Sequence, residues 1–199
     1  MTTTDSTDTT ALMELYDFAS GAFADPLDAS AIEALLSGPL PEPDAVRDEQ
    51  LAAGLAGLAE WIEGVDDPQA AADELEAVHT DLFVGPRPSL QIHESYYAGD
   101  FLGDPLASVQ STFQQLGIRP AGDLREEADH VAVELAALRE LSAAGDQEAK
   151  ATFLREHGWW FEDLAADIHE TADHDLYRAV GDIAAGLVTL DADRLGVEL

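Results

Sequence analysis

Apolar residues recur at the spacing of an α-helix along almost the whole chain, and no stretch shows the sustained alternation of a β-strand. Gly, Pro and Asp residues separate these Ala- and Leu-rich segments at positions typical of helix ends, such as Pro68 and Gly145. The pattern predicts an all-α fold, a single-domain helical bundle of roughly eight or nine helices. The expected helices span residues 11–23, 30–37, 45–62, 68–83, 102–116, 123–144, 147–156, 158–173 and 175–190.

The chain has 199 residues, enough for one domain of ordinary size. Residues 1–9 are rich in Thr and Asp and lack apolar periodicity, which predicts a disordered tail ahead of a domain over residues 10–199. The N-terminus does not resemble a secretory signal, and no apolar run approaches the roughly 18 residues of a membrane span. The absence of Cys excludes disulfides, thiolate metal sites and a cysteine nucleophile.

The formal net charge is -32, from 41 acidic and 9 basic residues. Such a chain lacks the basic face that binds nucleic acid, and anionic membrane surfaces would repel it. The acidic residues are spread along the sequence, and the basic ones are eight Arg and a single Lys. This composition favours adaptation to a salty cytoplasm, as in a halophilic organism, over capture of one cationic partner.

Two E-x-x-H elements suggest an alternative function as a di-iron carboxylate protein. Glu76 and His79 form one pair, and Glu127 and His130 form the other. Residues three apart share a helix face, and ferritin-like bundles combine two such pairs with a Glu from each of two further helices. Chance matches are expected in a helical sequence rich in Glu, so a chain that holds no metal and no cofactor is the favoured interpretation.

Other catalytic patterns are weak. His93, Glu94 and Ser95 are consecutive, and adjacent residues rarely converge as a base, an orienting acid and a nucleophile. The sequence contains no glycine-rich loop of the kinds that bind phosphate. The aromatic run over residues 159–161 is more typical of a core than of a cofactor site.

The longest irregular segment, residues 84–98, combines Gly and Pro with His, Glu, Ser and two Tyr residues. A proline-stiffened loop of this kind can line a groove between helices, and Asp129 and His130 could lie near it if the chain folds back. Such a groove would suit a peptide that has an apolar stretch flanked by arginines, because carboxylates bind guanidinium groups strongly.

Three motifs in order resemble the TorD/DmsD/NarJ family of chaperones that mature molybdenum-containing oxidoreductases. They are the L-F-x-G-P sequence at 82–86, the E-S-x-Y sequence at 94–97 and the D-H-x-x-x-E-L sequence at 129–135. The F-L-x-E-H stretch at 153–157 is also similar. The chain departs from the family pattern before E-S-x-Y, where Gln91 and Ile92 replace prolines, and at Tyr96, which replaces Val.

The resemblance implies a TorD-like helical fold and a binding activity rather than an enzymatic one. The chaperone would act in the cytoplasm, bind the apo catalytic subunit of a molybdopterin oxidoreductase or its twin-arginine signal peptide, assist cofactor insertion and delay export until the client has folded. Members of the family occur as monomers and as domain-swapped dimers, so a homodimer is compatible with it. The implied client- or signal-peptide-binding positions are Leu82, Phe83, Gly85, Pro86, Glu94, Ser95, Tyr97, Asp129, His130 and Glu134.

Overall fold

The computed structural model describes residues 4–85, 87–119 and 125–199. Over these residues the chain forms ten α-helices, one 3-10 helix and no β-strand, which confirms the predicted all-α class. The elements are α1 (Thr4–Ala24), α2 (Ala29–Ser37), η1 (Pro43–Ala45), α3 (Glu49–Glu63), α4 (Pro68–Phe83), α5 (Glu94–Tyr97), α6 (Asp104–Leu116), α7 (Val131–Ala144), α8 (Gln147–His157), α9 (Phe161–Thr171) and α10 (Asp175–Leu195).

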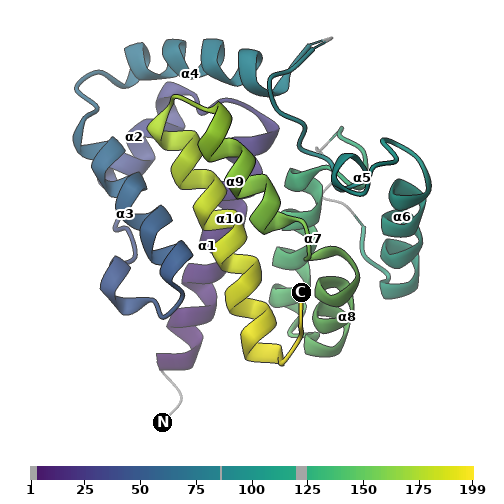
Figure 1. Cartoon of the computed structure of the whole chain (residues 1–199). Helices are drawn as coiled ribbons and strands as arrows, with labels where there is room; N and C mark the ends of the chain where they lie inside the picture. The colour runs from purple at the N-terminus through teal and green to yellow at the C-terminus, as the bar shows by residue number, and fades with distance from the viewer. Residues whose placement is uncertain (1–3, 86, 120–124) are drawn as a thin grey trace.

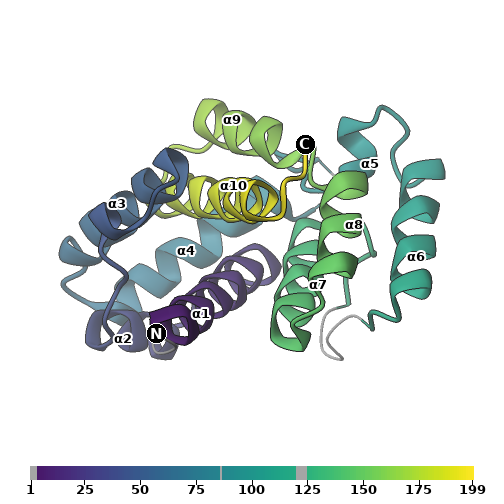
Figure 2. The same ribbon diagram turned by 90° about the horizontal axis from the view of Figure 1, so that it is seen from below.

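Helix α10 is the central helix of the bundle and packs against α1, α3, α8 and α9 (Figures 1 and 2). It approaches α3 closely because Gly54 and Gly186 lie at the contact. A Cβ on Gly54 would collide with the backbone of Ile183, and one on Gly186 would collide with that of Leu51. The core is therefore built around one long helix, and glycines at its contact with α3 let the two helices pack closely.

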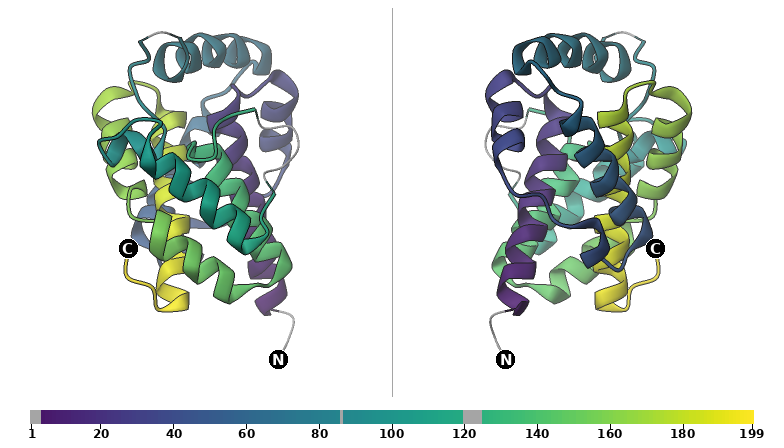
Figure 3. Two further views of the ribbon diagram at one scale, coloured as in Figure 1. Left: turned by 90° about the vertical axis from the view of Figure 1, so that its right-hand side faces the viewer. Right: turned by 90° about the vertical axis from the view of Figure 1, so that its left-hand side faces the viewer.

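Helix α4 lies across one end of this bundle, and α7 and α8 cover the side opposite α3 (Figure 1). Helices α5 and α6 form the outer layer on that side, where α6 packs on α8 (Figure 3, left). The stacked rings of Phe113 and Phe153, with centroids 5.7 Å apart, join α6 to α8. The chain enters this outer layer after α4 and leaves it after α6.

Local signals define many of the helix ends. Asp67 caps α4 ahead of Pro68, Asp146 caps α8, and Gly145 ends α7 in the left-handed conformation, with φ 67°. Helix α3 begins later than residue 45, where the sequence predicted its start. Asp48 accepts from the N–H of Leu51 and starts the helix at Glu49.

Two further predictions about helices were wrong. Residues 94–97, expected to be part of a loop, form the short helix α5. Helix α7 begins at Val131 rather than at residue 123, because residues 129–131 bond to the segment before α5 instead of continuing a helix. Residues 120–124 lie outside the described part of the chain.

The backbone of residues 4–9 is helical and belongs to α1, within the segment expected to be a disordered tail. The division into a tail and a domain over residues 10–199 stays a prediction. None of the helices in the described ranges combines the length and the apolar character that crossing a membrane requires.

Candidate functional site

The two motif segments expected to meet do so through a short antiparallel bridge between His93 and His130. The Glu94 N–H donates to the Asp129 carbonyl at 2.9 Å, and the Val131 N–H donates to the Ile92 carbonyl at 2.9 Å. These bonds confirm the predicted proximity of the Asp129–His130 pair and the 82–97 segment. They hold α5 against the start of α7.

The bend that leads to this bridge begins at Gly85, whose φ of +104° favours glycine. After it the chain folds back on α4, where the Leu90 N–H donates to the Leu82 carbonyl at 2.9 Å. Leu82 is buried, and the Phe83 ring packs edge-on against Phe23 and Tyr177. Leu82 and Phe83 thus anchor the bend in the core.

Asp129 and His130 are both buried, with 0% and 4% of their surfaces exposed. Asp129 Oδ2 accepts from the Ser95 N–H at 3.3 Å, and Oδ1 has no hydrogen-bond partner among the described residues. His130 caps α7 because its Nδ1 accepts from the Ala132 N–H at 3.2 Å. Burial, together with smaller effects of the neighbouring His93 and His79, lowers the pKa of His130 to about 3, so its ring is neutral at physiological pH.

Glu94 is the hub of a buried polar network below α5. Its Oε2 accepts from His157 Nδ1 at 2.9 Å, and its Oε1 accepts from the indole N–H of Trp159 at 3.0 Å. His157 Nε2 lies 3.0 Å from the Thr112 hydroxyl, which donates its single proton to Glu156 at 2.7 Å. Both ring nitrogens of His157 are therefore held, one by Glu94 and the other by Thr112.

Glu134 completes this network from α7. It is fully buried, its Oε2 accepts from the Trp160 N–H at 3.0 Å, and its carboxyl lies within hydrogen-bond reach of Glu94. Burial raises the pKa of Glu134 well above its usual value of 4.5, and the charge of Glu94 raises it further. Burial therefore favours the neutral form of Glu134, whose Oε1 has no hydrogen-bond partner among the described residues.

Replacing Glu134 by Gln should stabilise the fold at pH 7. The unfolded chain loses the Glu134 proton as the pH rises through about 4.5, whereas the folded protein keeps it, so ionisation favours the unfolded chain at neutral pH. Gln donates to Glu94, accepts from Trp160 and has no proton to lose. The expected gain in the free energy of unfolding is about 1.4 kcal/mol for each pH unit above 4.5 over which the folded protein keeps the proton, and it should vanish near pH 4.5.

Urea unfolding of the wild type and of Glu134→Gln at pH 7 and at pH 4.5 measures the change in the free energy of unfolding at each pH. Glu140→Gln, an exposed change on the same helix, is the control and should have little effect at either pH. A loss of stability in Glu134→Gln at both values would show that the carboxyl is ionised in the folded protein.

The remaining predicted positions lie around α5. The Ser95 hydroxyl is buried and accepts from the Leu102 N–H at 2.9 Å. Tyr97 is half-buried against Trp160 and donates to Asp167 at 3.2 Å. Pro86 lies outside the described residues. Contact of any of the ten predicted residues with a client stays a prediction.

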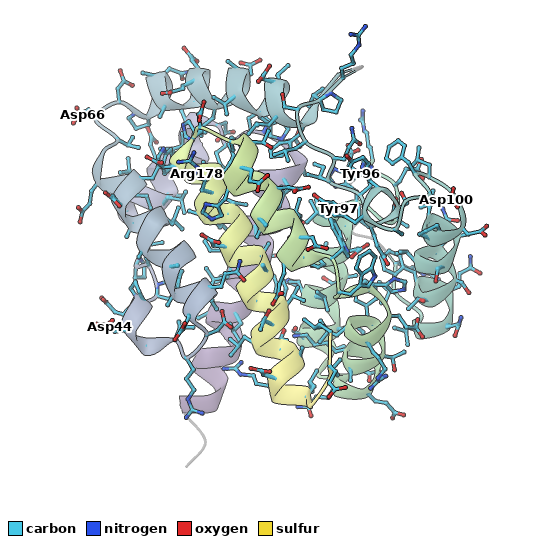
Figure 4. All side chains as sticks on the ribbon, viewed as in Figure 1. Asp44, Asp66, Tyr96, Tyr97, Asp100 and Arg178 are labelled. Carbon is cyan, nitrogen blue, oxygen red and sulfur yellow. The ribbon has the colours of Figure 1, made fainter. Side chains whose placement is uncertain are left out.

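Four large apolar side chains around α5 are exposed: Tyr96 by 49%, Phe101 by 51%, Leu102 by 46% and Trp159 by 37%. We call them the α5 surface; Figure 4 shows Tyr96 beside Tyr97 on α5. Tyr96 is part of α5. The backbone N–H of Leu102 donates to Ser95, the indole of Trp159 donates to Glu94, and the Phe101 ring lies 5.5 Å from the His93 ring. Sequence reasoning missed Trp159 because it assigned residues 159–161 together to the core, and only Trp160 and Phe161 are buried there.

Leu102 has a positive φ of 56°, the one non-glycine residue with this conformation among those described. The left-handed conformation costs a branched side chain roughly 1–2 kcal/mol. Strain of this kind in an exposed apolar residue is typical of a binding surface rather than of a core.

The di-iron alternative was wrong. Glu127 lies in the turn before α7, so Glu127 and His130 do not share a helix face. On α4, His79 is buried against the Phe23 carbonyl while Glu76 is exposed. Within the described ranges, no group of three or more His, Asp or Glu side chains is placed to hold a metal ion.

The consecutive residues His93, Glu94 and Ser95 do not form a catalytic triad. Glu94 bonds to His157 rather than to His93, and the Ser95 hydroxyl bonds to the Leu102 backbone. The buried network thus positions α5 and does not activate a nucleophile.

The family model described as nitrate reductase delta subunit matches residues 45–174, about two thirds of the chain. This range includes α5, the start of α7 and the His157–Trp160 turn. No curated protein matches the chain.

Proposed function

Because the chain belongs to the nitrate reductase delta subunit family, whose members are non-catalytic chaperones of molybdenum-enzyme maturation, we propose that it binds the apo catalytic subunit of a molybdopterin oxidoreductase. The client segment would be a twin-arginine signal peptide. Binding would keep the client competent for cofactor insertion and delay its export until it has folded. The chaperone would act in the cytoplasm.

One observation carries this proposal: apolar side chains are exposed and rigidly held in acidic surroundings. Residues 88–118 and 156–177 together supply the whole α5 surface, and neither segment contains an Arg or a Lys. Exposed carboxylates of the same segments include Asp100, Asp104 and Glu156. A polypeptide with an apolar stretch beside arginines fits both properties.

In this proposal the ten predicted residues act mainly from below the surface. Glu94, Ser95 and Asp129 are buried and hold α5, while Leu82 and Phe83 hold the bend before it. The exposed side chains would contact the client, and the buried ones would fix their positions. Preorganisation of this kind lowers the entropy lost on binding.

Leu102→Gly tests the proposal with little effect on the fold. Glycine removes the exposed side chain and also the strain of a positive φ, so the free energy of unfolding should change by no more than about 1 kcal/mol. The affinity for a fluorescent peptide with two consecutive arginines and an apolar stretch should fall about tenfold in an anisotropy titration.

Leu36→Ala is the matched control, because Leu36 is similarly exposed, by 39%, on α2 far along the chain from α5. It should leave the affinity unchanged. Equal affinities of the wild type, Leu102→Gly and Leu36→Ala would contradict a client site at α5. Absence of binding by the wild-type protein would contradict the proposed signal-peptide client.

A further inference from the structure

Trp159 differs from its neighbours in the α8–α9 turn. His157 and Trp160 are buried, with 1% and 0% of their surfaces exposed, whereas 37% of Trp159 is exposed. An indole in such a turn could be buried or free to move. Here its N–H donates to Glu94 at 3.0 Å, so one edge of the ring is fixed although the residue is partly exposed.

The turn that presents Trp159 is tightly packed. A Cβ on Gly158 would collide with the Leu154 carbonyl and the Leu199 side chain, so glycine lets the chain pass close to the C-terminus. On either side of Trp159, His157 is held by Glu94 and Thr112, and Trp160 is held by Glu134. The ring is thus presented from a framework with few degrees of freedom.

The surroundings of the ring favour a cation. The Glu94 carboxylate lies at the indole edge, and Glu156, with 49% of its side chain exposed, lies three residues away. Two arginines flank this segment in the sequence: Arg155, which is exposed in the last turn of α8, and Arg178, which pairs with Asp173 and Asp175. An aromatic face attracts a cation within about 6 Å, and arginine stacks on tryptophan better than lysine does.

We propose that Trp159 is a specificity-determining residue of the client site, and that its exposed face stacks on the guanidinium of an arginine in the client segment. Glu94 acts as the positioning residue that fixes the ring. This inference rests on the proposed function, since the arginine belongs to the signal peptide. It adds Trp159 and its contact with that arginine to the proposed client site.

A double-mutant cycle tests the contact directly. Trp159→Leu keeps an apolar side chain without a π face, and a second peptide has both arginines replaced by lysine. Affinities of both proteins for both peptides are measured in molar KCl, where the screening length of about 3 Å suppresses general attraction to the acidic protein. We expect the arginine preference of the wild type to exceed that of Trp159→Leu by roughly 2- to 30-fold. Trp159→Phe keeps a π face and should retain part of the preference.

Tryptophan fluorescence gives a second readout, which reports whether the peptide binds close to Trp159. Arginine peptide should shift or quench the emission of the wild type, and Trp159→Leu should lose this signal. Trp61→Leu is the matched control, because Trp61 lies half-buried in another acidic hollow of about 400 Å³ between α3 and α4 and should not report binding.

The outcomes separate the inference from the proposed function. Equal arginine preference of the wild type and Trp159→Leu, with both binding the peptide, would overturn the role of Trp159 and leave the client site standing. Loss of the fluorescence signal in Trp61→Leu instead would move the arginine contact to the α3–α4 hollow and overturn the inference. If the wild type binds neither peptide, both proposals fail.

Discussion

Replacing Glu94 by Ala should lower the free energy of unfolding by roughly 2–5 kcal/mol, because it removes the acceptor that two side chains of a buried network share. Glu94 is 4% exposed and accepts from His157 and Trp159. Without it, the buried His157 ring and the indole N–H of Trp159 lose the acceptor that they share. Urea unfolding at pH 7, with the midpoint and the slope both fitted, measures the loss.

Glu156→Ala is the control for this variant. Glu156 accepts from Thr112 in the same network, but about half of its side chain is exposed, so its removal should cost less than about 1 kcal/mol. Equal effects of the two changes would mean that Glu94 is not the hub of the network. The Glu94→Ala protein should also lose client affinity, since α5 and Trp159 lose a common anchor.

Replacing Lys150 by Met should destabilise the protein by a similar amount, about 3–5 kcal/mol. Lys150 is the single lysine of the chain and is buried in α8. It pairs with Asp191 of α10, donates to the Ser142 hydroxyl of α7 at 2.6 Å and lies over the Tyr16 ring of α1 at 5.2 Å. Burial lowers its pKa, whereas Asp191 raises it. The variant leaves the Asp191 carboxylate buried with Tyr16 as its remaining donor.

The double variant Lys150→Met/Asp191→Leu distinguishes charge pairing from packing. Replacing both partners of a buried pair by apolar residues is often neutral, so the second change should restore most of the lost stability. Thermal and urea unfolding of the two single variants and the double variant complete the cycle. A double variant less stable than either single variant would show that the pair contributes through shape rather than charge.

Much of the fold could be predicted because its signals are local. Pro68, Gly145 and Asp146 define helix ends within a few residues of sequence, and the structure uses each of them as expected. The start of α7 could not be predicted in this way. It depends on a bridge between His93 and His130, which are 37 residues apart, and no local pattern reports such a pairing.

The sequence predicted which residues belong to the site, but not what each of them does there. The sequence singled out Glu94, Asp129 and Glu134, and the structure brings them together, but it places their side chains inside. Adjacent Trp159 and Trp160 look alike in the sequence, and only the position of α5 decides which ring is exposed. The single Lys150 among Ala149, Phe153 and Leu154 was a signal of a buried pair that sequence reasoning could have used.

Hydrogen exchange of the protein with and without the twin-arginine peptide, in molar KCl, tests the central claim most directly. A client site at α5 predicts slower exchange of amides in residues 93–103 and 157–161 when the peptide is bound, with little change in α2 and α3. Protection confined to α2 and α3, with unchanged exchange around α5, would contradict it.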